Sequence, residues 1–181
     1  MLCMDTEFTD FNGTELVSVG IADVASDLTF YVEIRDVFDS YGWSAFAQST
    51  VRPLLAGPAT AIERGRVGQL LFEWLYAFPR PIVMLTDAPE WDWWLVKEVL
   101  QPFLGQLTIE PYRFDSLSLG VELAERMRAA RATYHGPGRP EHHALHDALA
   151  LRAQVLDAIS LGWEPDMNLI ASSMHSRRKW R

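Results

Sequence analysis

The chain has 181 residues, of which 49% are apolar and 12% aromatic, enough for one globular domain with a full core. Its formal net charge of −8 argues against a protein that coats duplex DNA, because such a protein is basic. No apolar run approaches the length of a membrane span, the first residues lack the features of a signal peptide, and the single cysteine excludes an internal disulfide. We therefore expect a cytoplasmic protein that does not contact membranes.

The first third of the chain predicts three strands. Met1–Met4 opens the first strand, while 15–23 and 28–34 are rich in the β-branched and apolar residues typical of strands. Turn signals separate these segments, at Asn12–Gly13 and at 25–27. Consecutive strands joined by short turns pair antiparallel, so we expect the sheet to open as a meander.

From residue 58 onwards, helical and strand patterns alternate, whereas 43–55 has no clear pattern. The expected strands are Ile82–Leu85 and 107–114. The expected helices run from Pro58–Thr60 to just before Pro79, from Pro89 to about Leu100, from a cap at Asp115 or Ser116, and from Glu141 to about Leu161. Three strands followed by alternating helices and strands predict an α/β fold with a mixed sheet.

The first strand leads into two carboxylates, Asp5 and Glu7, which are separated by one residue. Side chains alternate along a strand, so both carboxylates project from the same face. Neighbouring carboxylates repel one another unless a proton or a cation lies between them, and a divalent metal that prefers oxygen ligands satisfies that arrangement. A solvated strand end is the alternative for an isolated pair, so a metal site requires ligands from elsewhere in the chain.

A second acidic segment, 85–94, follows an expected strand and enters an expected helix. Ligands commonly bind at this edge of an α/β sheet. Asp92 lies among three tryptophans, so its desolvation is unfavourable unless a cation is present. The alternative is that the acids of this segment only interact favourably with the N-terminus of the helix.

A third segment, 141–147, contains three histidines and Asp147 directly after a glycine-rich loop. Histidine titrates near neutrality, so one of these side chains can accept a proton from water. His143 and Asp147 are four residues apart on one helical face, which also fits a zinc site, although the lack of nearby cysteines excludes a closed cysteine-rich one. A solvated helix start is the third possibility.

The three segments together are more specific than any one of them. The positions run in a fixed order along the chain: Asp5, Glu7, Trp91-Asp92, and His142 five positions before Asp147. This order resembles that of the DEDDh 3′–5′ exonucleases of the DnaQ-like superfamily, over about residues 1–159. The opening segment and the short chain are most similar to small bacterial and phage 3′–5′ exoribonucleases. The resemblance implies a ribonuclease H-like fold, in which helices flank a mixed sheet with antiparallel opening strands and then parallel strands.

The resemblance also implies a role for each position. It implies that two divalent metal ions, Mg²⁺ or Mn²⁺, are bound by four carboxylates: Asp5, Glu7, Asp92 and Asp147. It implies that His142 is the general base and that Glu7 has a further catalytic role at the 3′ end of the substrate. We also expect Thr6, Phe8 and Trp91 to contact the substrate, because the two aromatic side chains flank metal ligands and can stack on bases. Core packing is the alternative for both aromatic residues.

Asp87 departs from the family pattern, since many members carry asparagine ahead of the second-motif aspartate. The sequence leaves open whether Asp87 supports the ligands or takes no part in the site.

These expectations describe a 3′–5′ exoribonuclease that hydrolyses single-stranded RNA or short oligonucleotides from the 3′ end and releases nucleoside 5′-monophosphates. The preference for RNA rests on the resemblance alone, so a 3′–5′ DNA exonuclease stays open. A catalytically idle nucleic-acid-binding domain on the same fold and a metal-dependent phosphatase acting on small molecules are further alternatives.

We expect the exonuclease domain to span residues 1–161, and 162–181 to form a C-terminal extension that is basic at its end. The seven tryptophans suggest apolar surface available for self-association, and the family is often homodimeric. We therefore expect a homodimer.

Overall fold

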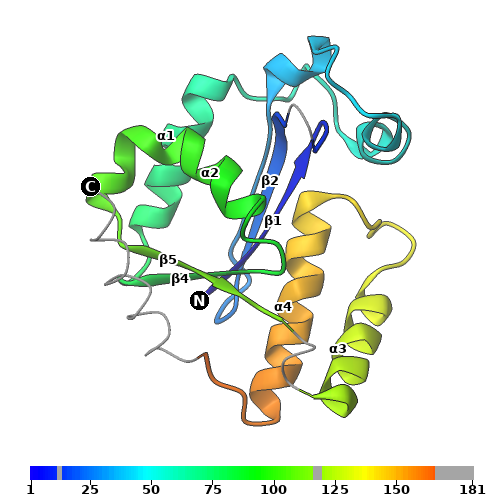
Figure 1. Cartoon of the computed structure of the whole chain (residues 1–181). Coiled ribbons are helices and arrows are strands. Elements are labelled where there is room, and N and C mark those ends of the chain that lie inside the picture. Colours follow the sequence, from blue (N-terminus) through cyan, green and yellow to red (C-terminus); the bar gives the residue numbers. More distant parts are fainter. Residues whose placement is uncertain (12–13, 116–119, 166–181) are drawn as a thin grey trace.

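The computed structural model describes residues 1–11, 14–115 and 120–165, which form an α/β fold around a five-stranded sheet (Figure 1). The sheet consists of β1 (Leu2–Phe8), β2 (Leu16–Asp23), β3 (Thr29–Glu33), β4 (Ile82–Thr86) and β5 (Ile109–Arg113). Its strand order is β3-β2-β1-β4-β5. The first three strands pair antiparallel, and β4 and β5 join parallel to β1 and to each other. The expected mixed sheet of a ribonuclease H-like fold is thereby confirmed, while the expected turn at Asn12–Gly13 lies outside the described residues.

Helices cover both faces of the sheet. They are α1 (Arg64–Tyr76), α2 (Asp92–Leu100), α3 (Val121–Tyr134) and α4 (Ala144–Ser160), with short helical turns at Arg35–Asp39, Ala47–Val51, Arg52–Leu54 and Gln101–Gln106. Helices α1 and α2 pack on one side, and α4 packs on the other with α3 beside it (Figure 1). Within the described part of the chain, no helix combines the length and apolarity that crossing a membrane requires.

The core is divided in two by the alternation of side chains along β1. Leu2 and Met4 belong to the larger apolar cluster, which also contains buried residues of α1 and α2. Cys3 points the other way, into a cluster that contains buried residues of α3 and α4. By the same alternation, Asp5 and Glu7 face α4 whereas Thr6 faces α2.

Helices α1 and α4 begin later than their sequence patterns predict, for local reasons. Before α1, Ile62 forms a parallel bridge with Ile34, and its N–H donates to the carbonyl of Glu33, so this stretch extends the sheet edge instead of coiling. Before α4, His142 has a φ of 62°, a left-handed conformation that no right-handed helix contains. The predicted starts near Thr60 and Glu141 are therefore several residues too early.

The first turn of α4 touches the backbone of β2 at Gly20. A Cβ atom at Gly20 would lie 2.2 Å from the carbonyl carbon of Ala144, so only glycine permits this approach. Gly20 is also the antiparallel partner of Asp5. The close contact therefore brings the start of α4 next to the first carboxylate of β1. Beyond this turn, α4 packs through small and β-branched residues, including Ala148, Val155 and Ala158.

Candidate metal centre

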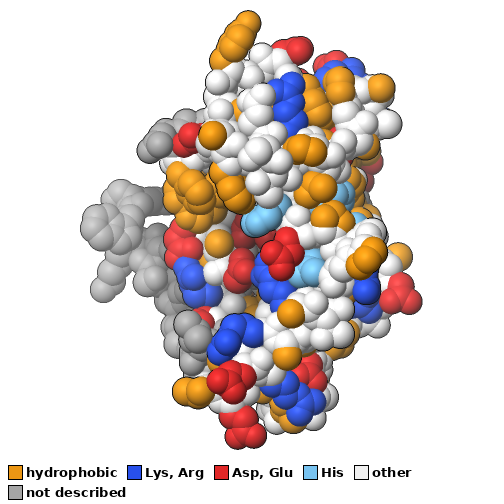
Figure 2. All heavy atoms as spheres, turned by 90° about the vertical axis from the view of Figure 1, so that its right-hand side faces the viewer, with side chains coloured by type: hydrophobic (Ala, Val, Ile, Leu, Met, Phe, Trp, Pro, Cys, Tyr) orange, Lys and Arg blue, Asp and Glu red, His pale blue; other side chains and the backbone are white. Residues whose placement is uncertain are grey.

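One cavity of about 490 Å³ collects the residues that the sequence singled out. It is lined by all eight of them: Asp5, Thr6, Glu7, Phe8, Trp91, Asp92, His142 and Asp147. They come from β1, the start of α2 and the region where α4 begins, which are far apart in the sequence. Figure 2 shows acidic side chains in a hollow of this face, with histidine and Lys or Arg side chains around it.

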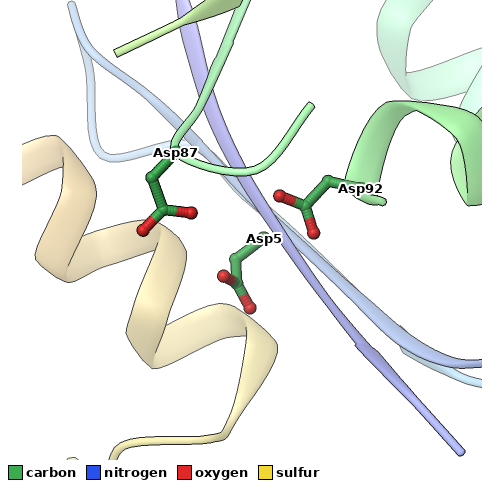
Figure 3. A group of neighbouring side chains, drawn as sticks. All are labelled: Asp5, Asp87 and Asp92. Carbon is green, nitrogen blue, oxygen red and sulfur yellow. The ribbon is translucent and has the colours of Figure 1, made fainter. Parts of the chain in front are cut away.

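Two overlapping groups of carboxylates meet in the cavity. Asp5, Glu7 and Asp147 each offer an oxygen, and these atoms all lie within 4.8 Å of one another. Asp5, Asp87 and Asp92 form a second such group, and Figure 3 shows their carboxylates pointing toward one another. Asp5 belongs to both groups. Among the described residues, neither group includes a histidine. The structure therefore does not support the alternative of a zinc site built from His143 and Asp147.

Neutral donors hold the carboxylate of Asp92. The hydroxyl of Thr6 donates to Asp92 Oδ1 at 2.7 Å, and the Thr6 backbone N–H donates to the same oxygen at 3.2 Å. The hydroxyl of Thr86, at the end of β4, donates to Asp92 Oδ2. Asp92 is only 3% exposed, so these bonds orient a carboxylate that water scarcely reaches.

The carboxylate of Asp147 is held differently. The Arg131 guanidinium of α3 donates to Asp147 Oδ1 at 2.9 Å, and His135 Nε2 lies 3.4 Å from that oxygen. The backbone N–H of His143, which precedes α4, donates to Asp147 Oδ2 at 3.2 Å. Asp147 is only 4% exposed, and the guanidinium of Arg131 contacts its carboxylate where water scarcely reaches.

Burial and mutual repulsion raise the pKa values of three carboxylates. Loss of hydration, followed by repulsion from Asp92, Glu7 and Asp147, holds the pKa of Asp5 well above its ordinary value. Burial and the neighbouring Asp147 raise the pKa of Glu7 to about 8. Burial raises the pKa of Asp92 to about 7, against the opposing hydrogen bonds from Thr86 and Thr6. Each of these groups therefore gains from a proton or a cation within the cavity.

Divalent cations fit this site by its donor chemistry. The available atoms are carboxylate oxygens, which Mg²⁺ and Mn²⁺ prefer, and they converge from three separate parts of the chain. Because burial and neighbouring carboxylates raise the pKa values of Asp5 and Glu7, a bound cation would stabilise their ionised forms. Asp5 and Glu7 with Asp147 would hold one ion, and Asp5 with Asp92 would hold a second.

Among the three histidines of the third segment, His142 is the one that lines the cavity. Its ring meets Phe46 edge to face, with ring centroids 5.1 Å apart. The ring of His143 stacks on Tyr31 instead, and His146 Nδ1 lies 3.4 Å from the hydroxyl of Tyr134. The left-handed backbone at His142 thus separates its side chain from those of its two neighbours.

Aromatic rings form one wall of the cavity. Phe8 and Trp91 stack with ring centroids 5.8 Å apart and an interplanar angle of 21°. Phe11 meets both of them edge to face. Both aromatic residues expected to contact the substrate therefore lie at the cavity, although they also pack on each other. Thr6, the third expected contact, uses its hydroxyl to hold Asp92.

Four further residues belong to the site although they were not predicted from the sequence: Arg131, His135, Thr86 and Phe46. Arg131 and His135 are four residues apart, which places them on one face of a helix, and this spacing was the available signal. Thr86 directly follows a buried apolar run, a position where polar side chains often support ligands. No pattern around Phe46 pointed to the cavity.

Comparison with known proteins supports the fold. No protein-family model matches the chain, and no curated protein matches its sequence. Among solved structures, S. pombe Pop2p in its Mg²⁺ and Mn²⁺ bound form is similar, with a TM-score of 0.63. The match covers 88% of this chain and 82% of that chain at 13% identity. A likeness at that identity shows a shared fold.

Proposed function

We propose that this chain is a metal-dependent 3′–5′ exonuclease that removes nucleoside 5′-monophosphates from the 3′ end of single-stranded RNA or short oligonucleotides. The observation that carries the proposal is the convergence of Asp5, Glu7, Asp92 and Asp147 on one cavity that His142 also lines. A module that only binds nucleic acid has no need for four converging carboxylates, three of them buried. The Mg²⁺ and Mn²⁺ bound to Pop2p, which has the same fold, also support the choice of these ions.

The four carboxylates would hold two divalent ions, which activate water and stabilise the departing 3′ oxygen when they are bound. His142 would take the proton from the attacking water, since its ring lies at the cavity and a neutral imidazole accepts a proton. Glu7 would also contact the terminal 3′ hydroxyl, which confines cleavage to chain ends. Phe8 and Trp91 would offer ring faces or edges to the last bases.

His142 can be separated from the metal ligands by mutation. We expect His142→Ala to retain the affinity of the protein for Mn²⁺ while release of mononucleotides falls to background, because the general base is lost and the carboxylates remain. His143→Ala is the matched control, since its ring stacks on Tyr31 away from the cavity. Undiminished turnover in His142→Ala would rule out the assigned base.

The nucleic acid can be identified with matched RNA and DNA oligonucleotides, each with a free or a blocked 3′ end. We expect mononucleotide release from RNA that a 3′ block abolishes. Faster degradation of DNA would make the protein a DNA exonuclease, and hydrolysis of phosphomonoesters alone would make it a phosphatase. Full resistance of all substrates in Mn²⁺ would indicate an idle binding domain.

We also propose a cytoplasmic homodimer with a domain boundary near residue 161. The described surface includes largely exposed apolar side chains, among them Val121, Tyr41 and Leu28, which a dimer interface could use. Light scattering during size-exclusion chromatography would test the dimer, and a mass equal to one chain would refute it.

A further inference from the structure

Arg131 joins the two carboxylate groups of the site. Its Nη2 donates to Asp147 Oδ1 at 2.9 Å, and its Nη1 donates to Asp87 Oδ2 at 3.1 Å. The side chain is 31% exposed and lines the cavity, so it reaches from α3 into the space between the groups. A guanidinium remains protonated at any pH at which the protein is folded. A fixed positive charge therefore lies among the carboxylates that are suited to bind metal.

Asp147 has one further hydrogen bond and one further close neighbour besides Arg131. The backbone N–H of His143 holds Oδ2 at 3.2 Å, and His135, whose side chain is 7% exposed, places Nε2 3.4 Å from Oδ1. Both contacts come from residues other than Arg131. Asp147 thus keeps the hydrogen bond from His143 when Arg131 is replaced, and every neutral replacement of Arg131 also removes its charge.

The charges in the cavity indicate how Arg131 affects metal binding. The two groups contain five different carboxylates, which Arg131 offsets by one positive charge. When all are ionised, the remaining four negative charges match two divalent cations. Before metal binds, Arg131 reduces the repulsion between the carboxylates. When metal binds, the same guanidinium repels the incoming cation.

The contact with Arg131 also bears on whether Asp87 acts as a metal ligand. This aspartate is near enough to Asp5 and Asp92 to serve as a ligand, but its Oδ2 is bonded to Arg131 and its side chain is 47% exposed. The loop is also held from outside the site, because Arg113 donates to the backbone carbonyl of Asp87 at 2.9 Å. One oxygen of Asp87 is therefore held by the guanidinium in a half-exposed side chain, whereas Asp147, which shares Arg131, and Asp92 are both buried.

We propose that Arg131 is a built-in countercation of the metal centre, which weakens metal binding and, by holding Asp87, keeps this carboxylate out of the ligand set. Arg131 thereby raises the concentration of Mg²⁺ or Mn²⁺ at which the site loads. This inference shares one premise with the proposed function, namely that the carboxylates bind divalent ions.

The first test is calorimetric titration of the metal-free protein with Mn²⁺, without any substrate. We expect Arg131→Met to bind Mn²⁺ on the order of tenfold more tightly, because a repelling charge has been removed. Arg131→Lys keeps the charge and should stay near the wild-type affinity. Arg126→Met is the matched control, since Arg126 lies on the same helix and pairs with Asp157 away from the cavity. Unchanged or weaker binding in Arg131→Met would overturn the proposal.

The second test is a double-mutant cycle between Asp87 and Arg131. With Arg131 present, Asp87→Asn should change Mn²⁺ affinity by less than about threefold, because Asp87 is not a ligand. In the Arg131→Met background, Asp87 is released toward Asp5 and Asp92, so the same substitution should weaken binding by about tenfold. Equal tenfold losses in both backgrounds would show that Asp87 is an ordinary ligand and would refute the inference. Glu90→Gln, in the same loop and paired with Arg113, is the control.

Folding is monitored by thermal melting with and without Mn²⁺. Metal-free Arg131→Met should melt at a lower temperature than wild type, and Mn²⁺ should restore it. If Arg131→Met does not fold, Arg131→Gln and the single Asp87→Asn variant still decide the question. Oligonucleotide cleavage at saturating Mn²⁺ is measured separately, so failure of the nuclease proposal and failure of this inference give different results.

Discussion

Asp92 and Asp147 each lie in a carboxylate group with Asp5 but are stabilised in different ways. Asp92 accepts hydrogen bonds from two threonines, which are neutral, and burial raises its pKa to about 7. Asp147 accepts a hydrogen bond from the Arg131 guanidinium. Both carboxylates are almost completely shielded from water. Asp147 is therefore in direct contact with a permanent positive charge, whereas the side-chain donors that reach Asp92 are neutral.

The difference suggests that the two sides respond differently to metal and to pH. Neutral donors orient a carboxylate without cancelling its charge, so the Asp92 side should attract a divalent cation strongly and should titrate near neutrality. A guanidinium cancels charge at all accessible pH values. The Asp147 side should therefore bind metal against a fixed competitor.

The largest effect is expected from Asp5→Asn, because Asp5 contributes an oxygen to both carboxylate groups. This variant should lose mononucleotide release and bind Mn²⁺ weakly at both positions. Asp92→Asn and Asp147→Asn should each retain one ion, as measured by calorimetric stoichiometry. Asp27→Asn, a fully exposed aspartate at the far end of the sheet, is the control. If Asp92→Asn and Asp147→Asn both retained two ions, the division into two sides would be incorrect.

Gly20→Ala should affect the Asp147 side selectively. The added methyl group would overlap the backbone of Ala144, so α4 must shift away from β2 and carry Asp147 with it. The free energy of unfolding should fall by about 1–3 kcal/mol or more, and one Mn²⁺ should bind much more weakly. Gly65→Ala is the control, because a methyl group there would meet no described atom within 4 Å outside its own stretch of helix. Chemical denaturation and calorimetry give the two quantities, and retention of two tight ions would contradict the role of Gly20.

Thr86→Val should affect the Asp92 side selectively and more mildly. Valine has nearly the same shape as threonine but removes the hydroxyl that donates to the carboxylate, which destabilises the protein by about 1–3 kcal/mol. The pKa of Asp92 should rise further, so Mn²⁺ binding should require higher pH. Thr60→Val, on the surface, is the control. A pH profile of Mn²⁺ affinity identical to that of wild type would show that the hydroxyl does not support Asp92.

The smallest expected effect is a gradual dependence of metal-free stability on pH. Glu7, with its pKa raised to about 8, and Asp92, at about 7, bind protons more tightly in the folded state than in the unfolded chain. Their contribution is complete below their unfolded pKa values, near 4, and is lost as the pH rises toward 8. The melting temperature should therefore fall between about pH 5 and pH 8.5 in chelator, and saturating Mn²⁺ should remove the decline. Glu7→Gln should flatten the slope, and an equally steep decline in that variant would exclude Glu7 as a contributor.

Much of the site was predictable because it depends on local rules. The period of two along a strand placed Asp5 and Glu7 on one face, and the structure has both at the cavity. The position of Asp92 at a strand-to-helix connection also indicated its place at the sheet edge. The choice of His142 over its neighbours came from the family resemblance, and the structure brings His142 alone of the three to the cavity.

Other features depend on which segments pack together, and the sequence does not contain that information locally. Arg131 lies on an amphipathic helix whose partner surfaces could not be assigned from its pattern. Gly20 occupies an ordinary strand position, and its importance arises only when α4 lies against it. The start of α1 was predicted too early because Ile62 is recruited by Ile34, which lies 28 positions before it in the chain. The expected cap at Asp115 is wrong for α3, whose N-cap is Gly120, and the alternative cap at Ser116 and the basic segment 172–181 lie outside the described residues.

The placement of β1 at the centre of the sheet has a consequence for folding. Two candidate ligands far apart in the chain, Asp5 and Asp147, meet only when β1 lies between β2 and β4 and α4 packs on the sheet. Such contacts between distant residues form late, because long stretches of chain must be ordered before they are gained. A fragment that stops before α4 would keep all five strands but lack Asp147 and His142. A fragment without β1 or without α4 therefore lacks part of the candidate site, and the site is complete only when both elements are present in the fold.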